Sequence, residues 1–268
     1  MGFETEGFLG KDAECLVGKQ RIEFQDLFEF AQDCSAMAMK LNSLPNSTDN
    51  FGVSIGVMFA RCIAQFQGAI ILAERGLSIE SMVLTRALFE TDFVLGALVS
   101  KTVTPEELVD SDLGSRRKIG NALLPISKAD SHVEHHAKLK AFIIDNAESK
   151  SLAFETIAKR AGMQTVYDGP YRFLSHFAAH PTITAASEYF VRQPNGHEYV
   201  RFHPLVSNTS KAVTFACNGI ILGCGTYENK VHQTQELNTE LKLLLDREEA
   251  LYQKYRPLDL NDEDESNK

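Results

Sequence analysis

FGVSIGVMFARCIAQFQGAIILAERGLSIESMVLTRALFETDFVLGALVS, residues 51–100, is the stretch of sequence that decides the fold. It contains two long apolar runs, Phe51–Arg75 and Ser78–Ser100, with Gly76 between them. Glycine commonly ends a helix and serine is a favoured N-cap, so we predict two helices, the second capped by Ser78. Helices joined by so short a turn lie antiparallel. The stretch therefore predicts a central helical hairpin.

The first of these runs is apolar nearly all round, as in a core helix or a membrane span. Arg61, Gln65 and Gln67 lie near its centre. A charge and two amides at that depth favour a helix in a protein core, because polar groups are costly in lipid. We predict no membrane association.

Apolar residues recur at helical spacing on both sides of this hairpin, in Arg21–Leu44, Ser210–Tyr227 and Val231–Tyr255. One segment differs. EYFVRQPNGHEYVRF, residues 188–202, alternates in two short β-rich runs around a Pro-Asn-Gly turn, which is typical of a β-hairpin. We predict a mainly α protein, a single helical bundle with a small β-hairpin insertion at residues 188–203.

The pattern of helices contains no internal repeat and no linker that would divide the chain. We predict one helical domain over residues 1–256, with its core at 21–182 and C-terminal helices at 206–256. The last residues, 257–268, are acidic and almost without apolar side chains. Such a composition predicts a disordered tail.

Charge and cysteine content restrict the class of partner. The net charge is -9, but the tail carries much of it, so the body is only mildly acidic. This argues against strong nonspecific binding to duplex DNA or to an anionic membrane. The five cysteines are scattered, form no C-x-x-C and indicate reduced thiols. With no signal-peptide pattern at the start, we predict a cytoplasmic protein without metal or other cofactor.

The charges of the central hairpin allow two interpretations. If the two helices fold about Gly76, Arg61 falls opposite Asp92 and near Glu90. Arg86 and Glu90 lie four apart on one helix face. Buried charges must be paired or solvated, because an isolated buried ion costs several kcal/mol. The residues therefore form either a structural ion-pair network or a polar pocket, in which Glu90 is a base or ligand and the arginines bind anions.

A second polar cluster occurs in DGPYRFLSHFAAHPT, residues 168–182. We predict a helix that Asp168 caps and that ends before Pro181. On it Arg172, His176 and His180 share one face at spacings of four. Tyr171 and Ser175 form the adjacent stripe.

Three kinds of chemistry fit this helix. His176 and His180 could share a metal ion, but no H-E-x-x-H pattern accompanies them. His180 could act as a general acid or base together with Arg172, Ser175 or Tyr171, and with Glu90 from the neighbouring hairpin. A nucleophilic pair of Ser175 and His180 is disfavoured, because five residues along an ideal α-helix separate two side chains by about 140°.

Residues 73–99 together with YRFLSHFAAHPT resemble a bacterial helical family catalogued as a domain of unknown function. Its members carry an Arg-x-x-x-Glu motif and a later Tyr-x-x-Leu-Ser-x-x-x-x-His-Pro motif, and the resemblance covers about residues 51–182. It assigns functional positions to Arg86 and Glu90 in the first motif, and to Tyr171, Ser175, His180 and Pro181 in the second.

More distantly, the chain is similar to the HEPN superfamily of small helical bundles. Many of these are ribonucleases of toxin–antitoxin and phage-defence systems that act as dimers. In their active motif four to six residues separate an Arg from a His, and a polar residue often follows the Arg. Here Arg172 is followed by Phe173, and three residues separate it from His176 and seven from His180. The resemblance implies metal-independent RNA cleavage, in which His180 moves a proton and Arg172 stabilises the phosphorane.

Our leading hypothesis is a HEPN-like protein that cleaves or binds RNA in a stress or phage-defence system. The expected partners are RNA and, because apolar helices lack visible partners, a second copy of the chain. Two alternatives stay open, a non-catalytic helical interaction module and a small-molecule-binding bundle. The predicted catalytic residues are His180, Arg172 and Glu90, and the predicted binding residues are Arg86, Tyr171, Ser175, His176 and Arg61.

Overall fold

A computed structural model describes residues 3–45, 47–127, 133–193, 196–231 and 234–255. The predicted acidic tail, 257–268, lies outside these residues. The described chain is mainly α-helical with one two-stranded antiparallel sheet, which confirms the predicted fold class.

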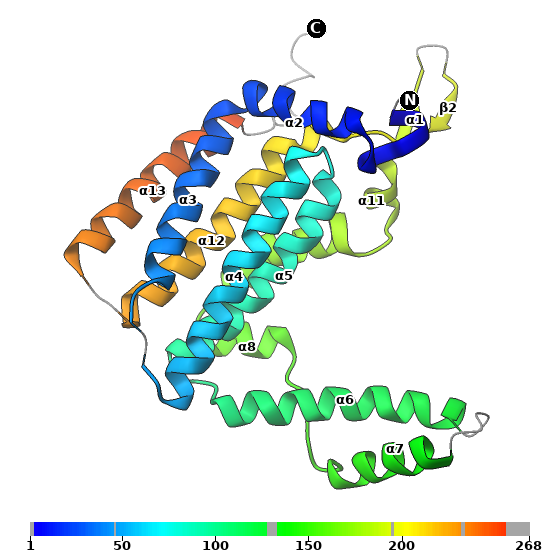
Figure 1. Ribbon diagram of the computed structural model, residues 1–268, viewed down its shortest axis with the longest axis vertical. Coiled ribbons are helices and arrows are strands. Elements are labelled where there is room, and N and C mark those ends of the chain that lie inside the picture. The colour runs from blue at the N-terminus through cyan, green and yellow to red at the C-terminus, as the bar shows by residue number, and fades with distance from the viewer. Residues whose placement is uncertain (1–2, 46, 128–132, 194–195, 232–233, 256–268) are drawn as a thin grey trace, which may run out of the picture.

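The centre of the fold is the predicted hairpin of α4 (Asn50–Glu74) and α5 (Ser78–Val99) (Figure 1). Helix α12 (Thr209–Val231) packs on both of its helices, and α3 (Gln25–Asn42) and α13 (Gln235–Tyr255) pack on α12. Gly76 makes the turn at a φ of +77°, which favours glycine. A Cβ atom at this position would lie 2.7 Å from the Cβ of Pro204.

Ser78 does not cap α5, so this part of the prediction was wrong. The N-cap position belongs to Leu77, which makes no side-chain cap, and Ser78 is the first helical residue. Its hydroxyl donates instead to the carbonyl of Leu205, 2.9 Å away. A long-range partner therefore replaces the local capping bond, and it ties the segment after the β-hairpin to the turn of the central helices.

Aromatic side chains fill the space between α3, α4, α5 and α12. The largest of those that are almost fully buried are Phe30, Phe59, Phe66, Phe89, Phe93 and Tyr227. The ring of Phe59 stacks on that of Tyr227 with centroids 4.1 Å apart. Burial of each such side chain stabilises the fold by about 1.5–3 kcal/mol. Four of the five cysteines are also buried, and all five are free thiols.

A pair of helices, α6 (Pro105–Ser127) and α7 (Val133–Asp145), forms an arm that projects from the bundle (Figure 1). The arm begins at a capping box: the Thr104 hydroxyl accepts from the backbone N–H of Glu107, and the Glu107 carboxylate accepts from that of Thr104. Close approach of the following chain depends on Gly114, where a Cβ would lie 2.6 Å from the backbone nitrogen of Ser151.

Shorter elements complete the structure. At the N-terminal side they are α1 (Phe3–Glu6), η1 (Gly7–Leu9) and α2 (Lys11–Glu23). Between the arm and the sheet they are α8 (Phe154–Arg160), α9 (Gln164–Val166), η2 (Tyr167–Tyr171), α10 (Arg172–Leu174), η3 (Ser175–Ala179) and α11 (Ile183–Ser187). Strands β1 (Phe190–Arg192) and β2 (Glu198–Val200) pair Phe190 with Val200 and Arg192 with Glu198, and η4 (Val206–Asn208) follows.

Among the described helices, α4 alone is long and apolar enough to cross a membrane by length and composition. It contacts α3, α5 and α12 within the bundle. The core helix of a soluble protein has these same properties.

Candidate functional site

Four of the predicted residues meet between α5 and the segment 167–179. They are Arg86 and Glu90 of α5 together with Tyr171 and Ser175, and we call them the Arg86 network. The Arg86 Nε donates to the Ser175 hydroxyl at 2.8 Å, and its Nη2 donates to the Tyr171 hydroxyl at 2.9 Å. The Nη2 also lies 3.0 Å from Glu90 Oε1, to which Tyr171 donates at 3.0 Å.

The Arg86 network is half-buried. The side chains of Arg86 and Glu90 are 25% and 18% exposed, and Tyr171 is buried. Burial raises the pKa of the Tyr171 hydroxyl, and the adjacent Glu90 carboxylate raises it further. Tyr171 therefore keeps its proton at neutral pH, and its hydroxyl donates a hydrogen bond to Glu90. The guanidinium also lies over the tyrosine ring, 5.1 Å from its centroid.

The segment that carries Tyr171 and Ser175 is wound more widely than an α-helix. It starts at Gln164 instead of at the predicted cap, Asp168, and continues through Pro170. Residues 167–171 and 175–179 form two π-helical turns, in which hydrogen bonds span five residues. Such turns often occur at functional sites.

The second π-turn changes the expected relation of Ser175 and His180. The backbone N–H of His180 donates to the carbonyl of Ser175, 3.1 Å away. Because this hydrogen bond spans five residues, Ser175 and His180 are separated by one π-helical turn. The angle of about 140° between side chains five residues apart on an ideal α-helix therefore does not apply. His180 has a ψ of 145°, which ends the helix before Pro181 as predicted.

The remaining candidates on this segment face solvent. Arg172 lies 3.3 Å from Asp168 and 3.8 Å from Glu155, so it belongs to exposed ion pairs and not to the Arg86 network. The His176 ring nitrogen Nε2 is 3.3 Å from the hydroxyl of Thr184. The His180 imidazole is exposed and makes no hydrogen bond to the described residues.

The same segment carries an exposed aromatic ring that the sequence reasoning missed. Phe173 is 41% exposed, and its ring stacks on those of Phe177 and Phe215 at 5.2 and 5.4 Å. The Lys211 ammonium lies 4.8 Å from the centre of the Phe177 ring. The spacing of Phe173 and Phe177 could have indicated a stacked pair, whereas Phe215 and Lys211 come from the distant helix α12.

Arg61 does not face Asp92, which corrects the predicted pairing. Arg61 is exposed, whereas Asp92 is fully buried and accepts a hydrogen bond from the Cys62 thiol at 3.2 Å. Residues equidistant from Gly76 do lie at the same level of the hairpin, because Cys62 is the neighbour of Arg61. Distance from Gly76 in the sequence therefore predicts the position of a residue along the helix axis, but not the direction in which its side chain points around that axis.

Burial raises the pKa of the Asp92 carboxyl well above its usual range, and the Cys62 thiol only partly opposes this. Helix α12 closes over the carboxyl at Gly223, where a Cβ would lie 2.8 Å from Asp92 Oδ1. Its Oδ2 has no hydrogen-bond partner among the described residues. Asp92 is thus a buried carboxyl of the core that lies apart from the Arg86 network.

We expect Asp92→Asn to reduce the loss of stability that occurs as the pH rises above about 4. The folded-state pKa is raised, so above about pH 4 the folded protein binds the proton more tightly than the unfolded chain. The free energy of unfolding then falls by up to about 1.4 kcal/mol per pH unit from this group, until the folded carboxyl ionises. Urea unfolding at pH 5 to 8 should show the advantage of the variant over wild type growing with pH. A constant difference would contradict this account.

The described residues contain no group of three or more His, Cys, Asp or Glu side chains arranged to hold a metal ion. His176 and His180 therefore have no third ligand of these types within the described chain.

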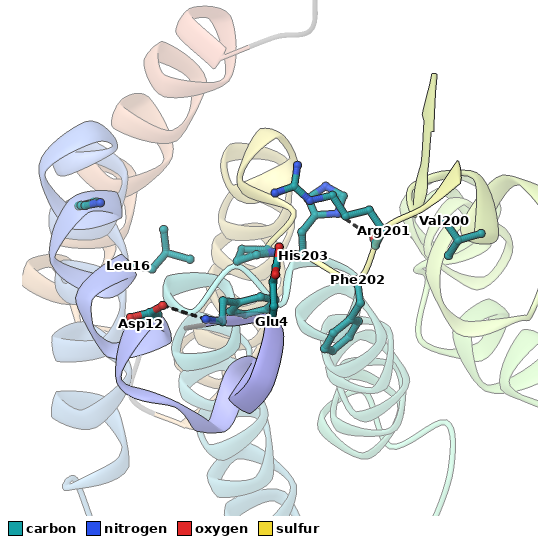
Figure 2. A pocket seen from close by; sticks show the side chains of 10 residues that line it. Glu4, Asp12, Leu16, Val200, Arg201, Phe202 and His203 are labelled. Atoms are coloured by element: carbon teal, nitrogen blue, oxygen red, sulfur yellow. Dashed lines mark hydrogen bonds between the residues drawn. The ribbon is translucent and has the colours of Figure 1, made fainter. Parts of the chain in front are cut away.

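A separate hollow of about 520 Å³ lies between the N-terminal helices and the chain that leaves β2 (Figure 2). Leu16, Lys19, Arg201, Phe202 and His203 are among the residues that line it. Figure 2 also shows a carboxylate of this hollow, Asp12, which accepts a hydrogen bond from the backbone of Phe3 at 2.8 Å. No residue of the Arg86 network lines it.

Comparison with protein-family models matches residues 53–198 to a family described as of unknown function, DUF5677. The matched range contains the Arg86 network and the exposed face of segment 172–180. No curated protein and no solved structure matches the chain.

Proposed function

We propose that this chain, which belongs to the family DUF5677, is a HEPN-like protein that binds and cleaves single-stranded RNA. The cleavage needs no metal ion, and the protein acts in a stress or phage-defence system. The proposal rests on the site that lies within the matched range. The observation that carries the proposal is the exposed row of side chains on one helical segment, Arg172, Phe173, His176 and His180. The Arg86 network bonds to Tyr171 and Ser175 of the same segment.

This row has the composition of a surface for single-stranded RNA. Unpaired bases stack on aromatic side chains, and cationic side chains neutralise the phosphates between them. Phe173 offers a partly exposed ring that stacks on the rings of Phe177 and Phe215. The Lys211 ammonium lies over the Phe177 ring, and the Arg172 guanidinium lies over the nearby ring of Tyr167. The mildly acidic body of the protein is compatible with such a local cationic surface.

The nucleophile of the proposed reaction is a 2′-hydroxyl of the RNA itself. His180 takes the proton of a 2′-hydroxyl, the 2′-oxygen bonds to the adjacent phosphorus, and the bond from phosphorus to the 5′-oxygen breaks. The leaving oxygen takes a proton from solvent, and the product is a 2′,3′-cyclic phosphate. Arg172 stabilises the phosphorane; its exposed ion pairs are worth only up to about 1 kcal/mol, so a phosphate can displace them.

In this proposal the Arg86 network positions the catalytic segment. Arg86 donates a hydrogen bond to the Ser175 hydroxyl. The Ser175 carbonyl in turn accepts the backbone hydrogen bond of His180 that closes the π-turn. Glu90, which the sequence suggested as a catalytic group, holds Arg86 and Tyr171 and so acts through them.

A second candidate, a non-catalytic helical interaction module, is supported by the closed bonding of the Arg86 network, which suits a structural clamp. The two candidates differ in one assay. We expect wild-type protein to cleave a labelled single-stranded RNA in excess EDTA and to leave 2′,3′-cyclic phosphate ends. A homogeneous preparation that leaves the RNA intact would remove the enzyme claim and favour the module.

We expect Phe173→Ala to weaken binding of single-stranded RNA by about tenfold, because stacking of one base on an aromatic ring is worth about 1–3 kcal/mol. Fluorescence anisotropy at fixed salt measures the affinity. Phe190→Ala, which removes a ring that is 54% exposed on β1, is the matched control and should leave the affinity unchanged. Equal affinities for both variants and wild type would place the RNA elsewhere.

A further inference from the structure

The most apolar helix of the protein leaves one of its faces uncovered. Val53 and Val57 of α4 are 53% and 57% exposed, and Ala60 and Ala64 are exposed further along the same face. The face carries one charge near its middle, Arg61, which makes no ion pair with the described residues. An exposed apolar stripe with a single cation suits a protein surface better than lipid.

The uncovered face continues into a groove between α4 and the arm. This groove has a volume of about 460 Å³, and Val53, Val109 and Leu113 contribute apolar groups to it. Two carboxylates, Glu106 and Asp110, also line it and are exposed. The groove thus combines apolar groups from α4 and α6 with carboxylates from α6.

The cation of the exposed face and the acidic groove lie at equal distances from Val57, on opposite sides of it along the helix. Val53, in the groove, lies four residues before Val57, and Arg61 lies four residues after it, so each is about 6 Å along the helix. A two-fold axis through Val57 would set α4 of two copies antiparallel. Arg61 of each copy would then face Val53 of the other copy, beside the carboxylates of its groove.

We propose that a second copy of the chain occupies this face and forms a two-fold symmetric dimer. Val57 packs against its counterpart on the axis, and Arg61 of each copy pairs with Asp110 of the other. Because a two-fold interface is isologous, this ion pair occurs twice. One surface thus supplies both partners of the contact.

The area that a stable dimer needs brings the arm into the interface. Residues 50–64 of α4 span about 22 Å, and a strip about 10 Å wide along them covers only about 220 Å². Stable interfaces bury about 800 Å² on each partner, so α6 must contribute the rest. This helix offers the exposed side chains of Val109, Ile119 and Leu123, and it belongs to the arm that projects from the bundle (Figure 1).

The test is a charge exchange followed by sedimentation equilibrium. Arg61→Glu sets two carboxylates against each other at both ion pairs, and Asp110→Arg sets two cations against each other. We expect each variant alone to raise the dimer Kd by at least about tenfold. In an equimolar mixture one pair becomes Glu with Arg and the other stays native, so the affinity should return close to that of wild type.

Ile183→Glu is the matched control, because it places a charge at a side chain that is 86% exposed on α11, outside the proposed face. Its Kd should equal that of wild type, and circular dichroism should show all variants folded. Monomeric wild-type protein, unchanged association of the single variants, or failure of the mixture to recover would overturn the proposal. A face that binds another protein or a membrane would give the first of these results.

Discussion

His180→Ala is expected to lower the rate of RNA cleavage by about 100- to 10,000-fold, the usual contribution of one general acid or base. The reason is chemical, because alanine leaves no group at this position that can accept the 2′-hydroxyl proton. The fold should hardly change. The imidazole is exposed and makes no hydrogen bond to the described residues, and such surface substitutions usually alter stability by less than about 0.5 kcal/mol.

A second histidine variant provides the control. His203 lies in the hollow of Figure 2, where its ring nitrogen Nδ1 is 2.8 Å from the carbonyl of Arg201. We expect His203→Ala to cleave RNA at the wild-type rate, and both variants to bind RNA with wild-type affinity. If His180→Ala retained full activity, the catalytic assignment would fall even though the protein cleaved RNA.

Arg86→Ala is expected to lower the free energy of unfolding by about 2–3 kcal/mol. The substitution leaves the Glu90 carboxylate half-buried without its cation, and it removes the donors to Ser175 and Tyr171. Removal of one partner from a fully buried ion pair costs about 3–5 kcal/mol, and the partial exposure of this pair reduces that cost. Urea unfolding monitored by circular dichroism measures the change.

The double variant Arg86→Ala/Glu90→Ala identifies the cause. It removes the unpaired carboxylate as well, so we expect it to be more stable than Arg86→Ala alone. The matched control is another pair four residues apart, Glu134 and Lys138 on α7, whose side chains are 78% and 72% exposed. Lys138→Ala should cost no more than about 0.5 kcal/mol. Additive effects at Arg86 and Glu90 would mean that the Arg86 network contributes no coupling.

The central hairpin could be predicted because its signals are local. Two apolar runs and a glycine between them define α4 and α5, and Gly76 has the positive φ that such a turn requires. The partner of Ser78 could not be predicted, because its hydroxyl bonds to Leu205, far along the chain. Local capping rules cannot take account of such a competing partner.

The candidate site was predicted in part. Arg86 and Glu90 are four apart on α5, and Tyr171 and Ser175 share a stripe, so each pair could be recognised from spacing and from the family resemblance. Tyr171 and Ser175 lie within two π-turns, which ordinary helical periodicity does not represent. The same limitation applies to the relation of Ser175 and His180, because the angle of about 140° assumes an ideal α-helix.

Arg61 shows a different limit of sequence reasoning. Its level on the hairpin was predicted almost correctly, yet its neighbour Cys62 faces Asp92 and Arg61 faces outward. The rotation of an apolar helix is set by what packs on it. Since α4 has apolar residues nearly all round, its own sequence does not mark the buried side.

The position of α12 has a consequence for how the protein is made. This helix begins at Thr209, after the matched family range ends at residue 198, yet it packs against both α4 and α5. During translation, the central hairpin leaves the ribosome long before α12 is synthesised. Until then Phe59 lacks the Tyr227 ring on which it stacks, and the nascent chain exposes apolar surface that attracts chaperones.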